Sequence, residues 1–269
     1  KILNCKNSQW IQDIWPEAIE TTIGLKSKKL KKIINLLQSY MWNKSDILFA
    51  QSEDLKNYLV KNTKCSNIET LYNPVRQNNI VTKDFLNVIS NNVDINITFM
   101  GTVGKGRSIN LMLDAFNKLD NDNIYFNICG TGSEFKKLQN LYNYNKIVWH
   151  GWLEDEKLDS IAKKTDFFIF GLENKGRQAY ILPSKIQTYC KYSKPVICIS
   201  NGAPRSLVEK FNIGIVSKSN SINDIKDAII LATKMTDEEK KLLSNNSFRL
   251  FENFFSQTAV TSKFQNTHE

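Results

Sequence analysis

Two glycine-rich turns and one helix start contain the residues of this 269-residue chain that could do chemistry. The first turn contains Gly101, Thr102, Gly104 and Lys105, and the second contains Gly130 and Gly132. Each turn stands between an apolar run and an amphipathic run, where backbone N–H groups can approach an anion at the positive end of a helix. Ligands of open α/β sheets bind at the carboxyl ends of the strands, so two such turns predict a phosphate site there. For either turn alone, a tight turn without a ligand is the alternative.

Residues 182–197 hold the most specific pattern in the chain. Pro183 suits the start of a helix, and Ser184 and Lys185 place a hydroxyl and an ammonium group at its positive end. A helix start and a lysine that face a glycine-rich turn can hold a diphosphate whose negative charge grows as it leaves. An exposed helix lysine without such a role is the alternative.

Strands and amphipathic helices alternate along the chain and must position these residues. We expect strands at 8–14, 46–51, 68–72, 95–100, 124–129, 146–150, 166–170, 195–200 and 213–216. We expect helices at 29–44, 110–119, 134–142, 154–164, 184–192 and 205–211, with further helix starts at Ser52, Ser221 and Thr236. This alternation predicts an α/β fold with parallel sheets that are covered on both faces.

The composition excludes several classes of protein. Hydrophobic residues make up 41% of the chain and charged residues 23%, as in an ordinary globular protein. No apolar run approaches the roughly 18–20 residues of a membrane span, and no signal peptide is recognisable. The five cysteines are scattered, which argues against disulfides or a zinc site and for a reducing, cytoplasmic location. Because the chain begins with Lys1, we expect it to be part of a longer gene product.

The positive charge of the chain gathers near its start. The chain has 36 basic and 27 acidic residues, a net charge of +9, and no acid stands between Thr21 and Ser45. In the expected helix 29–44 apolar residues recur at helical spacing with lysines opposite. A positive face attracts nucleic acid, an acidic membrane or phosphorylated substrates, and a solvated helix face is the alternative.

Several of these segments together resemble a known family, the retaining glycosyltransferases of family 4, and within it the subgroup that builds bacterial surface polysaccharides such as O-antigen, capsule and exopolysaccharide. The resemblance covers nearly the whole chain, and its most specific part is the helix 183–189. The matching segments are WIQDIWPE (10–17), LYNP (71–74), FMGTVGK (99–105), CGTG (129–132), PSKIQTY (183–189), KPVI (194–197) and Gly214.

The resemblance implies the GT-B fold, in which two Rossmann-like domains face each other across a cleft. It divides the chain into an incomplete amino-terminal, acceptor-side domain (1–78), a linker (79–93), a nucleotide-sugar domain (94–250) and a carboxyl-terminal helix or tail (251–269). Relatives have more strands before the Asp-Ile-Trp-Pro segment, and these would supply much of the acceptor pocket.

The resemblance also implies a reaction and a site. The chain would move a sugar, with retention of configuration, from a nucleotide-sugar, with a UDP-sugar expected, to a lipid-linked or glycan acceptor. Lys185 and Lys105 would be the catalytic cations, and Asp13 and Trp15 would lie on the acceptor side. The donor would be bound by Gly101, Thr102, Gly104, Gly130, Gly132, His150, Ser184, Gln187 and Thr188.

The same resemblance bears on cofactors and location. No cofactor, metal or nucleic acid is expected, since cations and amides would hold the diphosphate. The helix at Lys26–Lys44 would contact an anionic membrane, so we expect a cytoplasmic protein that is peripheral on the inner face of the cytoplasmic membrane. In the loop before the key helix, Glu173, Lys175 and Arg177 would touch the donor sugar, with a solvated loop as the alternative.

Departures from the family pattern keep two other hypotheses open. Tyr180 and Thr188 stand where many relatives have two glutamates, and Thr102 stands where many have an arginine. These differences and the missing strands favour a non-catalytic nucleotide-binding or scaffold protein as the main alternative. A P-loop NTPase is the third hypothesis, because residues 101–108 match that pattern except for Arg107 in place of its lysine.

Overall fold

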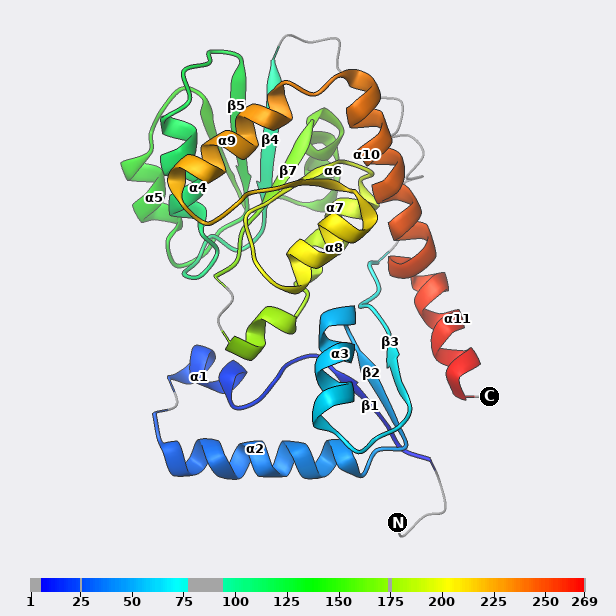
Figure 1. The fold of residues 1–269 in the computed structure, drawn as a ribbon. Coiled ribbons are helices and arrows are strands. Elements are labelled where there is room, and N and C mark those ends of the chain that lie inside the picture. The colour runs from blue at the N-terminus through cyan, green and yellow to red at the C-terminus, as the bar shows by residue number, and fades with distance from the viewer. Residues whose placement is uncertain (1–5, 25, 77–93, 174–175, 269) are drawn as a thin grey trace.

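The computed structural model describes residues 6–24, 26–76, 94–173 and 176–268, and it contains two parallel β-sheets flanked by helices (Figure 1). The predicted α/β class is confirmed. The expected linker at 79–93 lies outside the described residues, and the expected domain boundaries stay a prediction.

The elements follow one another much as the sequence pattern predicts. The strands are β1 (Ser8–Ile11), β2 (Ile47–Ala50), β3 (Ile68–Thr70), β4 (Ile95–Met100), β5 (Ile124–Cys129), β6 (Ile147–Gly151), β7 (Phe167–Phe170), β8 (Val196–Cys198) and β9 (Gly214–Val216). The α-helices are α1 (Glu17–Ile23), α2 (Lys28–Asn43), α3 (Glu53–Asn62), α4 (Ile109–Asn117), α5 (Phe135–Leu141), α6 (Asp155–Lys164), α7 (Ser184–Lys191), α8 (Ala203–Phe211), α9 (Ile222–Thr233), α10 (Asp237–Leu250) and α11 (Gln257–His268). A 3-10 helix, η2 (Gly176–Tyr180), precedes α7, and a π-helix, η3 (Phe251–Phe255), follows α10.

The larger sheet has six parallel strands in the order β6-β5-β4-β7-β8-β9. Starting from β4, the chain adds β5 and β6 on one side of the sheet and then β7, β8 and β9 on the other side, which is the doubly wound order. The direction changes between β4 and β7, and in such sheets a ligand binds at the carboxyl ends of the strands beside that change. The strand order alone therefore points to the loops after β4 and β7.

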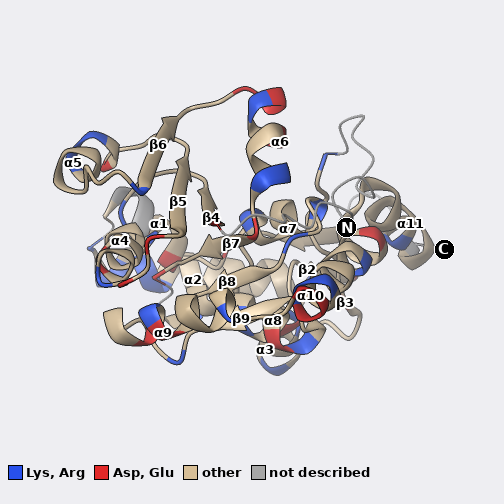
Figure 2. Cartoon of the chain, turned by 90° about the horizontal axis from the view of Figure 1, so that it is seen from above, with Lys and Arg blue, Asp and Glu red and all other residues tan. Residues whose placement is uncertain are grey.

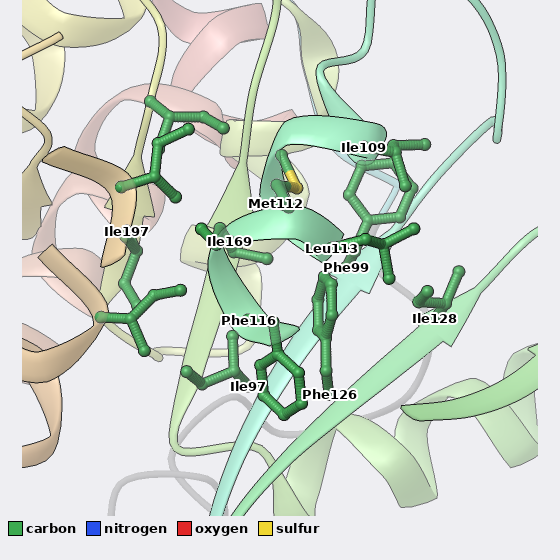
Figure 3. Close-up of a cluster of buried hydrophobic side chains, with 14 of the residues drawn as sticks. Ile97, Phe99, Ile109, Met112, Leu113, Phe116, Phe126, Ile128, Ile169 and Ile197 are labelled. Atoms are coloured by element: carbon green, nitrogen blue, oxygen red, sulfur yellow. The ribbon is translucent and has the colours of Figure 1, made fainter. Parts of the chain in front are cut away.

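Helices cover both faces of this sheet because side chains alternate along each strand. Figure 3 shows one face, where Phe99, Phe126 and Ile169 pack against Met112 and Phe116 of α4, and α9 joins the same core. The residues between them point to the opposite face, where a second buried core includes side chains from α6, α7, α8 and α10. The expectation of a sheet covered on both sides is confirmed.

The smaller sheet has three parallel strands in the order β1-β2-β3. One of its faces packs against α3 and Trp42 of α2. The other face is covered by α11, which returns from the carboxyl end of the chain (Figure 1). Val260 of α11 joins the core of Phe49 and Leu71, and the ring of Phe264 lies 5.4 Å from that of Phe49.

The orientation of α2 differs from the usual pattern of a surface helix. Its inward face is largely polar, with Gln38 buried and accepting a hydrogen bond from the Trp15 amide at 3.2 Å. Its apolar row is exposed instead, with side chains between 44% and 63% accessible at Leu30, Ile33, Leu36, Leu37, Tyr40 and Met41. The sequence periodicity correctly predicted a helix, but it did not show that the apolar row would lie outside the core.

The start of the chain also differs from the expectation in one detail. The first strand ends at Ile11, so Asp13 lies in the loop before α1 and not on the strand as predicted. Ile11 pairs with Ala50, the last residue of β2, so the ladder ends there, and Gln12 O accepts a hydrogen bond from the Gln51 side chain instead.

Helix starts read from the sequence are confirmed. The hydroxyls of Ser52, Ser221 and Thr236 each accept a hydrogen bond from a backbone amide of the first turn, and Thr236 with Glu239 forms a capping box. Figure 2 shows that α10 and α6 both carry charges of the two signs, as solvated helices do. In the part of the chain that the structure describes, no helix combines the length and the apolar character needed to span a bilayer.

Candidate functional site

The two glycine-rich turns lie against each other at the carboxyl ends of β4 and β5. The Gly101 amide donates to Cys129 O at 2.8 Å, and the Val103 amide donates to Thr131 O at 2.9 Å. A Cβ atom on Gly130 would lie 1.8 Å from Gly101 O, and one on Gly132 would lie 2.3 Å from Val103 O. Both glycines are therefore required for the close approach of the two turns.

The start of α7 lies beside the first turn. A Cβ atom on Gly101 would be 3.3 Å from Cε of Lys185, so the lysine side chain runs directly over that glycine. Tyr189, one turn further along α7, accepts a hydrogen bond from the Met100 amide at 3.1 Å and donates to Met100 O at 3.0 Å. Tyr189 is fully buried and its ring stacks on Phe168 of β7 at 4.3 Å. These contacts fix α7 against β4 and β7, the pair of strands at which the sheet changes direction.

The site carries positive charge that nearby groups do not neutralise. Burial lowers the pKa of the Lys185 ammonium group, and the positive charge of Arg107 lowers it further. Among the described residues, no carboxylate lies within ion-pair distance of Lys185 or Arg107. Two neighbouring cations in a half-buried place favour an anionic ligand, because an anion would relieve both the repulsion and the desolvation. Arg107 was not among the predicted site residues, although its place in the glycine-rich turn was the available signal.

Backbone amides point to the same conclusion. The Val103 amide is taken up by Thr131 O, whereas the amides of Thr102 and Gly104 donate to no acceptor among the described residues. Lys105 and Ser184 are exposed, Lys105 on the same turn and Ser184 at the first position of α7. The structure thus brings the start of α7, with Ser184 and Lys185, next to the turn that contains Gly101 and Lys105.

Three other predicted donor-site residues have different surroundings. His150, on β6, is half-buried, and its Nε2 lies 2.9 Å from Asn127 Oδ1. Burial lowers the pKa of His150. Gln187 is fully buried, and neither of its side-chain polar atoms has a hydrogen-bond partner among the described residues. The Thr188 hydroxyl donates to Ser184 O at 3.2 Å. Their roles in binding stay predictions.

Asp13 and Trp15 line a separate cavity of about 470 Å³ in the amino-terminal unit. Its walls come from β1, the loop after it, α1 and the apolar side of α2, including Leu37 and Met41. Asp13 and Trp15 are both exposed. The structure therefore places these two residues together, at a cavity whose lining belongs to residues 9–42.

The loop before α7 is engaged in contacts with the protein. The Glu173 amide donates to Gly106 O at 2.9 Å, which connects this loop to the first glycine-rich turn. Arg177 binds Glu17 of α1, with 2.6 Å between Nε and Oε1 and 2.7 Å between Nη2 and Oε2. The guanidinium group thus forms an ion pair between the two units, and the contact of Arg177 with a donor sugar stays a prediction. The predicted contact of Lys175 lies outside the described residues.

Two parallel α/β units, one in the doubly wound order and joined to the other by a returning carboxyl-terminal helix, match the GT-B class of glycosyltransferase structures. Residues 85–248 match the family described as "Glycosyl transferases group 1", and this chain belongs to that family. The match covers β4 to α10 and so includes Gly101, Lys185 and the turns around them.

Comparison with individual proteins agrees with the family and the fold. An uncharacterized glycosyltransferase of Methanocaldococcus jannaschii, MJ1069, is 26% identical over 224 residues, which are 78% of this chain and 52% of that protein. The chain therefore spans about half the length of this curated relative. The crystal structure of HepE from Anabaena in complex with UDP has a TM-score of 0.70 and 12% identity, with 97% of this chain and 71% of that chain covered. The structure of WaaG, a glycosyltransferase involved in lipopolysaccharide biosynthesis, has a TM-score of 0.66 and 10% identity, with coverage of 97% and 73%.

Proposed function

We propose that this chain takes part in the transfer of a sugar from a nucleotide-sugar, with a UDP-sugar as donor, and with retention of the anomeric configuration. The observation that carries the proposal is the meeting of Lys185 and Arg107 beside the Gly101 turn, at the strand ends where the sheet changes direction. A nucleoside diphosphate carries the negative charge that would neutralise these two cations. The structure of HepE with UDP supports a uridine nucleotide as the first ligand to test.

The chemistry follows from where negative charge develops. The bond between the anomeric carbon and the diphosphate oxygen breaks, and its electron pair stays on the diphosphate. The acceptor hydroxyl attacks the same face of the sugar and gives its proton to the departing phosphate oxygen. Lys185, with Lys105, Arg107 and the amides of Thr102 and Gly104, would stabilise the departing charge. One preorganised donor of this kind accelerates a reaction by about 100- to 1,000-fold.

Cations and amides that neutralise the diphosphate can do so without a metal ion. The described residues contain no group of three or more histidine, cysteine, aspartate or glutamate side chains that could hold a metal. That the transfer proceeds without metal stays a prediction, and the EDTA arm of the test below asks whether the nucleotide binds without metal.

The acceptor we propose is a lipid-linked saccharide of a bacterial surface polysaccharide, handled at the inner face of the cytoplasmic membrane. The helix α2 supports this part, because its exposed Leu36 and Tyr40 lie among the exposed Lys28, Lys29 and Lys32. Apolar side chains among lysines suit an anionic bilayer surface, where each lysine contributes about 1 kcal/mol. The cavity beside Asp13 and Trp15 is our candidate for the acceptor side.

Binding of UDP with Lys185 as its cation is tested first. Thermal unfolding of the whole protein is followed with UDP and with ATP, each in one arm with EDTA and no magnesium and in a second arm with magnesium. We expect UDP to raise the Tm and ATP to leave it unchanged, and we expect Lys185→Gln to abolish the effect of UDP. Lys164→Gln, at an exposed lysine of α6, is the matched control and should behave as wild type.

The alternatives give different results in the same experiment. A P-loop NTPase would show a higher Tm with ATP and magnesium and no change with UDP. A non-catalytic nucleotide-binding protein would respond to UDP but release no UDP from a panel of UDP-sugars when lipid-linked acceptors are supplied. If UDP does not change the Tm of the wild-type protein, the proposal loses its basis.

A further inference from the structure

One arginine ties the segment before α7 to the amino-terminal unit. Arg177 lies on η2, and its guanidinium group binds both carboxylate oxygens of Glu17, at 2.6 and 2.7 Å. A bidentate pair of this kind fixes direction as well as distance, because the planar guanidinium group matches the planar carboxylate.

The remaining donors of the same guanidinium group are also used. Nη1 donates to Asn35 Oδ1 at 3.0 Å and to the Tyr58 hydroxyl at 3.1 Å, and Nη2 donates to Trp15 O at 3.2 Å. Burial alone would lower the pKa of Arg177, but its hydrogen bonds to Glu17 and Tyr58 raise it above the usual value. All five N–H donors of one side chain thus bind three helices and a loop of the other unit.

The groups at the two ends of this connection belong to the candidate site. On one side, Arg177 holds the loop 12–17, which carries Asp13 and Trp15, and Gln178 Nε2 adds a bond to Ile14 O at 3.4 Å. On the other side, the same segment leads directly into α7 and Lys185. The Leu182 amide, just before α7, donates to Gln51 Oε1 at 3.2 Å, so the connection continues up to the start of that helix.

We infer that Arg177 is a positioning residue, which holds the start of α7 and the loop 12–17 in one arrangement so that Lys185 and the acceptor-side residues keep a fixed relation. Its chemical meaning rests on the proposed function. A side chain that binds two parts of a site in advance removes the cost of ordering them when the ligand binds.

The test compares the full chain with Arg177→Gln and Glu17→Gln, and with Arg205→Gln as the control. Arg205 has a similar ion pair, with Glu209 at 2.9 Å, but that pair lies within α8. Hydrogen exchange of amides in 12–17 and 176–182 should become about tenfold faster in the first two variants and stay unchanged in the control. Arg177→Lys should not restore slow exchange, because an ammonium group cannot form the bidentate pair.

A second readout separates positioning from general stabilisation. Affinities for UDP and UMP are measured on each variant, because UDP has the second phosphate that Lys185 would bind and UMP lacks it. We expect the ratio of UDP to UMP affinity to fall about fivefold in Arg177→Gln and in Glu17→Gln, with UMP affinity unchanged, because a loosened α7 no longer presents Lys185. Thermal unfolding confirms that each variant is folded.

The outcomes distinguish the two proposals. Wild-type protein that binds neither nucleotide would overturn the proposed function, whatever the exchange rates show. Wild-type protein that binds UDP normally, with Arg177→Gln indistinguishable from Arg205→Gln in exchange and in the UDP-to-UMP ratio, would overturn the positioning role alone. Faster exchange with an unchanged ratio would also overturn it, since the contact would then only stabilise the fold.

Discussion

Glycine at positions 130 and 132 is explained by the neighbouring backbone, whatever the ligand. Both residues are pressed against carbonyl oxygens of the first turn. Gly104, on that first turn, has ordinary space around it, with Ser133 Oγ at 3.6 Å from the place of a Cβ atom. Glycines in one glycine-rich site therefore differ in kind: some are required by packing, and others leave room for a ligand or a side chain.

This difference predicts opposite results for two similar substitutions. Gly132→Ala should lower the free energy of unfolding by about 2–3 kcal/mol, because its Cβ atom would meet Val103 O at 2.3 Å and push the two turns apart. Gly104→Ala should change it by less than about 0.5 kcal/mol. Urea unfolding of both variants checks this, and equal stability of the two would show that the turns are not packed as described.

Individual site residues could be predicted from the sequence only where they belong to a recognisable local pattern. Lys185 follows a proline at a helix start, which is a local signal, and the structure places it beside Gly101. Arg177 had no such signal, because its partners Glu17, Asn35 and Tyr58 are more than a hundred residues away in the chain. Contacts of that range depend on the arrangement of the two units, which periodicity does not contain.

At the scale of elements, α2 combines an apolar row and lysines on its outer surface. Its attachment to the amino-terminal unit is made by a few inward groups. They include the buried Trp42, Gln38, which binds the Trp15 amide, and Lys31, which pairs with Glu20. Large exposed apolar side chains in a row are unusual for a soluble surface and mark a place of contact. Strands and helix starts were largely predictable because each follows from local composition, whereas the rotation of α2 about its axis depends on what the neighbouring elements offer.

Membrane contact through α2 can be measured with lipid vesicles. The triple variant Lys28→Gln, Lys29→Gln and Lys32→Gln should bind vesicles of phosphatidylglycerol about 10- to 100-fold more weakly than wild type, since each lysine contributes up to about 1 kcal/mol. Binding should also weaken with added salt.

A control variant with the same net charge replaces Lys136, Lys137 and Lys241, which are exposed on α5 and α10, by glutamine. Sedimentation of both proteins with anionic and with phosphatidylcholine vesicles compares them. Equal binding of the two variants would assign the attraction to overall charge and remove α2 from the argument.

At the scale of the molecule, α11 joins the two units. It leaves the second unit after η3 and packs on the sheet of the first, where Val260 is buried and Lys263 lies 3.2 Å from Glu69. The ion pair is partly exposed and contributes little, so the apolar contacts provide most of the stabilisation.

We therefore expect the double variant Val260→Ala and Phe264→Ala to lower the stability of the amino-terminal unit by about 2–4 kcal/mol. Leu242→Ala, at an exposed position on α10, is the control and should have no measurable effect. Urea unfolding measures the stability of the protein, and hydrogen exchange of the amides in β2 and β3 reports on the amino-terminal unit separately. Unchanged exchange in these strands would show that α11 does not stabilise the sheet it covers.

The same helix gives the chain a particular order of assembly on the ribosome. Phe49 and Leu71 emerge early, but the residues of α11 that shield them are translated nearly two hundred residues later. Until then the nascent amino-terminal unit exposes the apolar face of its sheet, a surface of the kind that chaperones bind. The core of the first unit is therefore complete only when α11 has been translated. Release of the polypeptide before that point would leave an aggregation-prone intermediate.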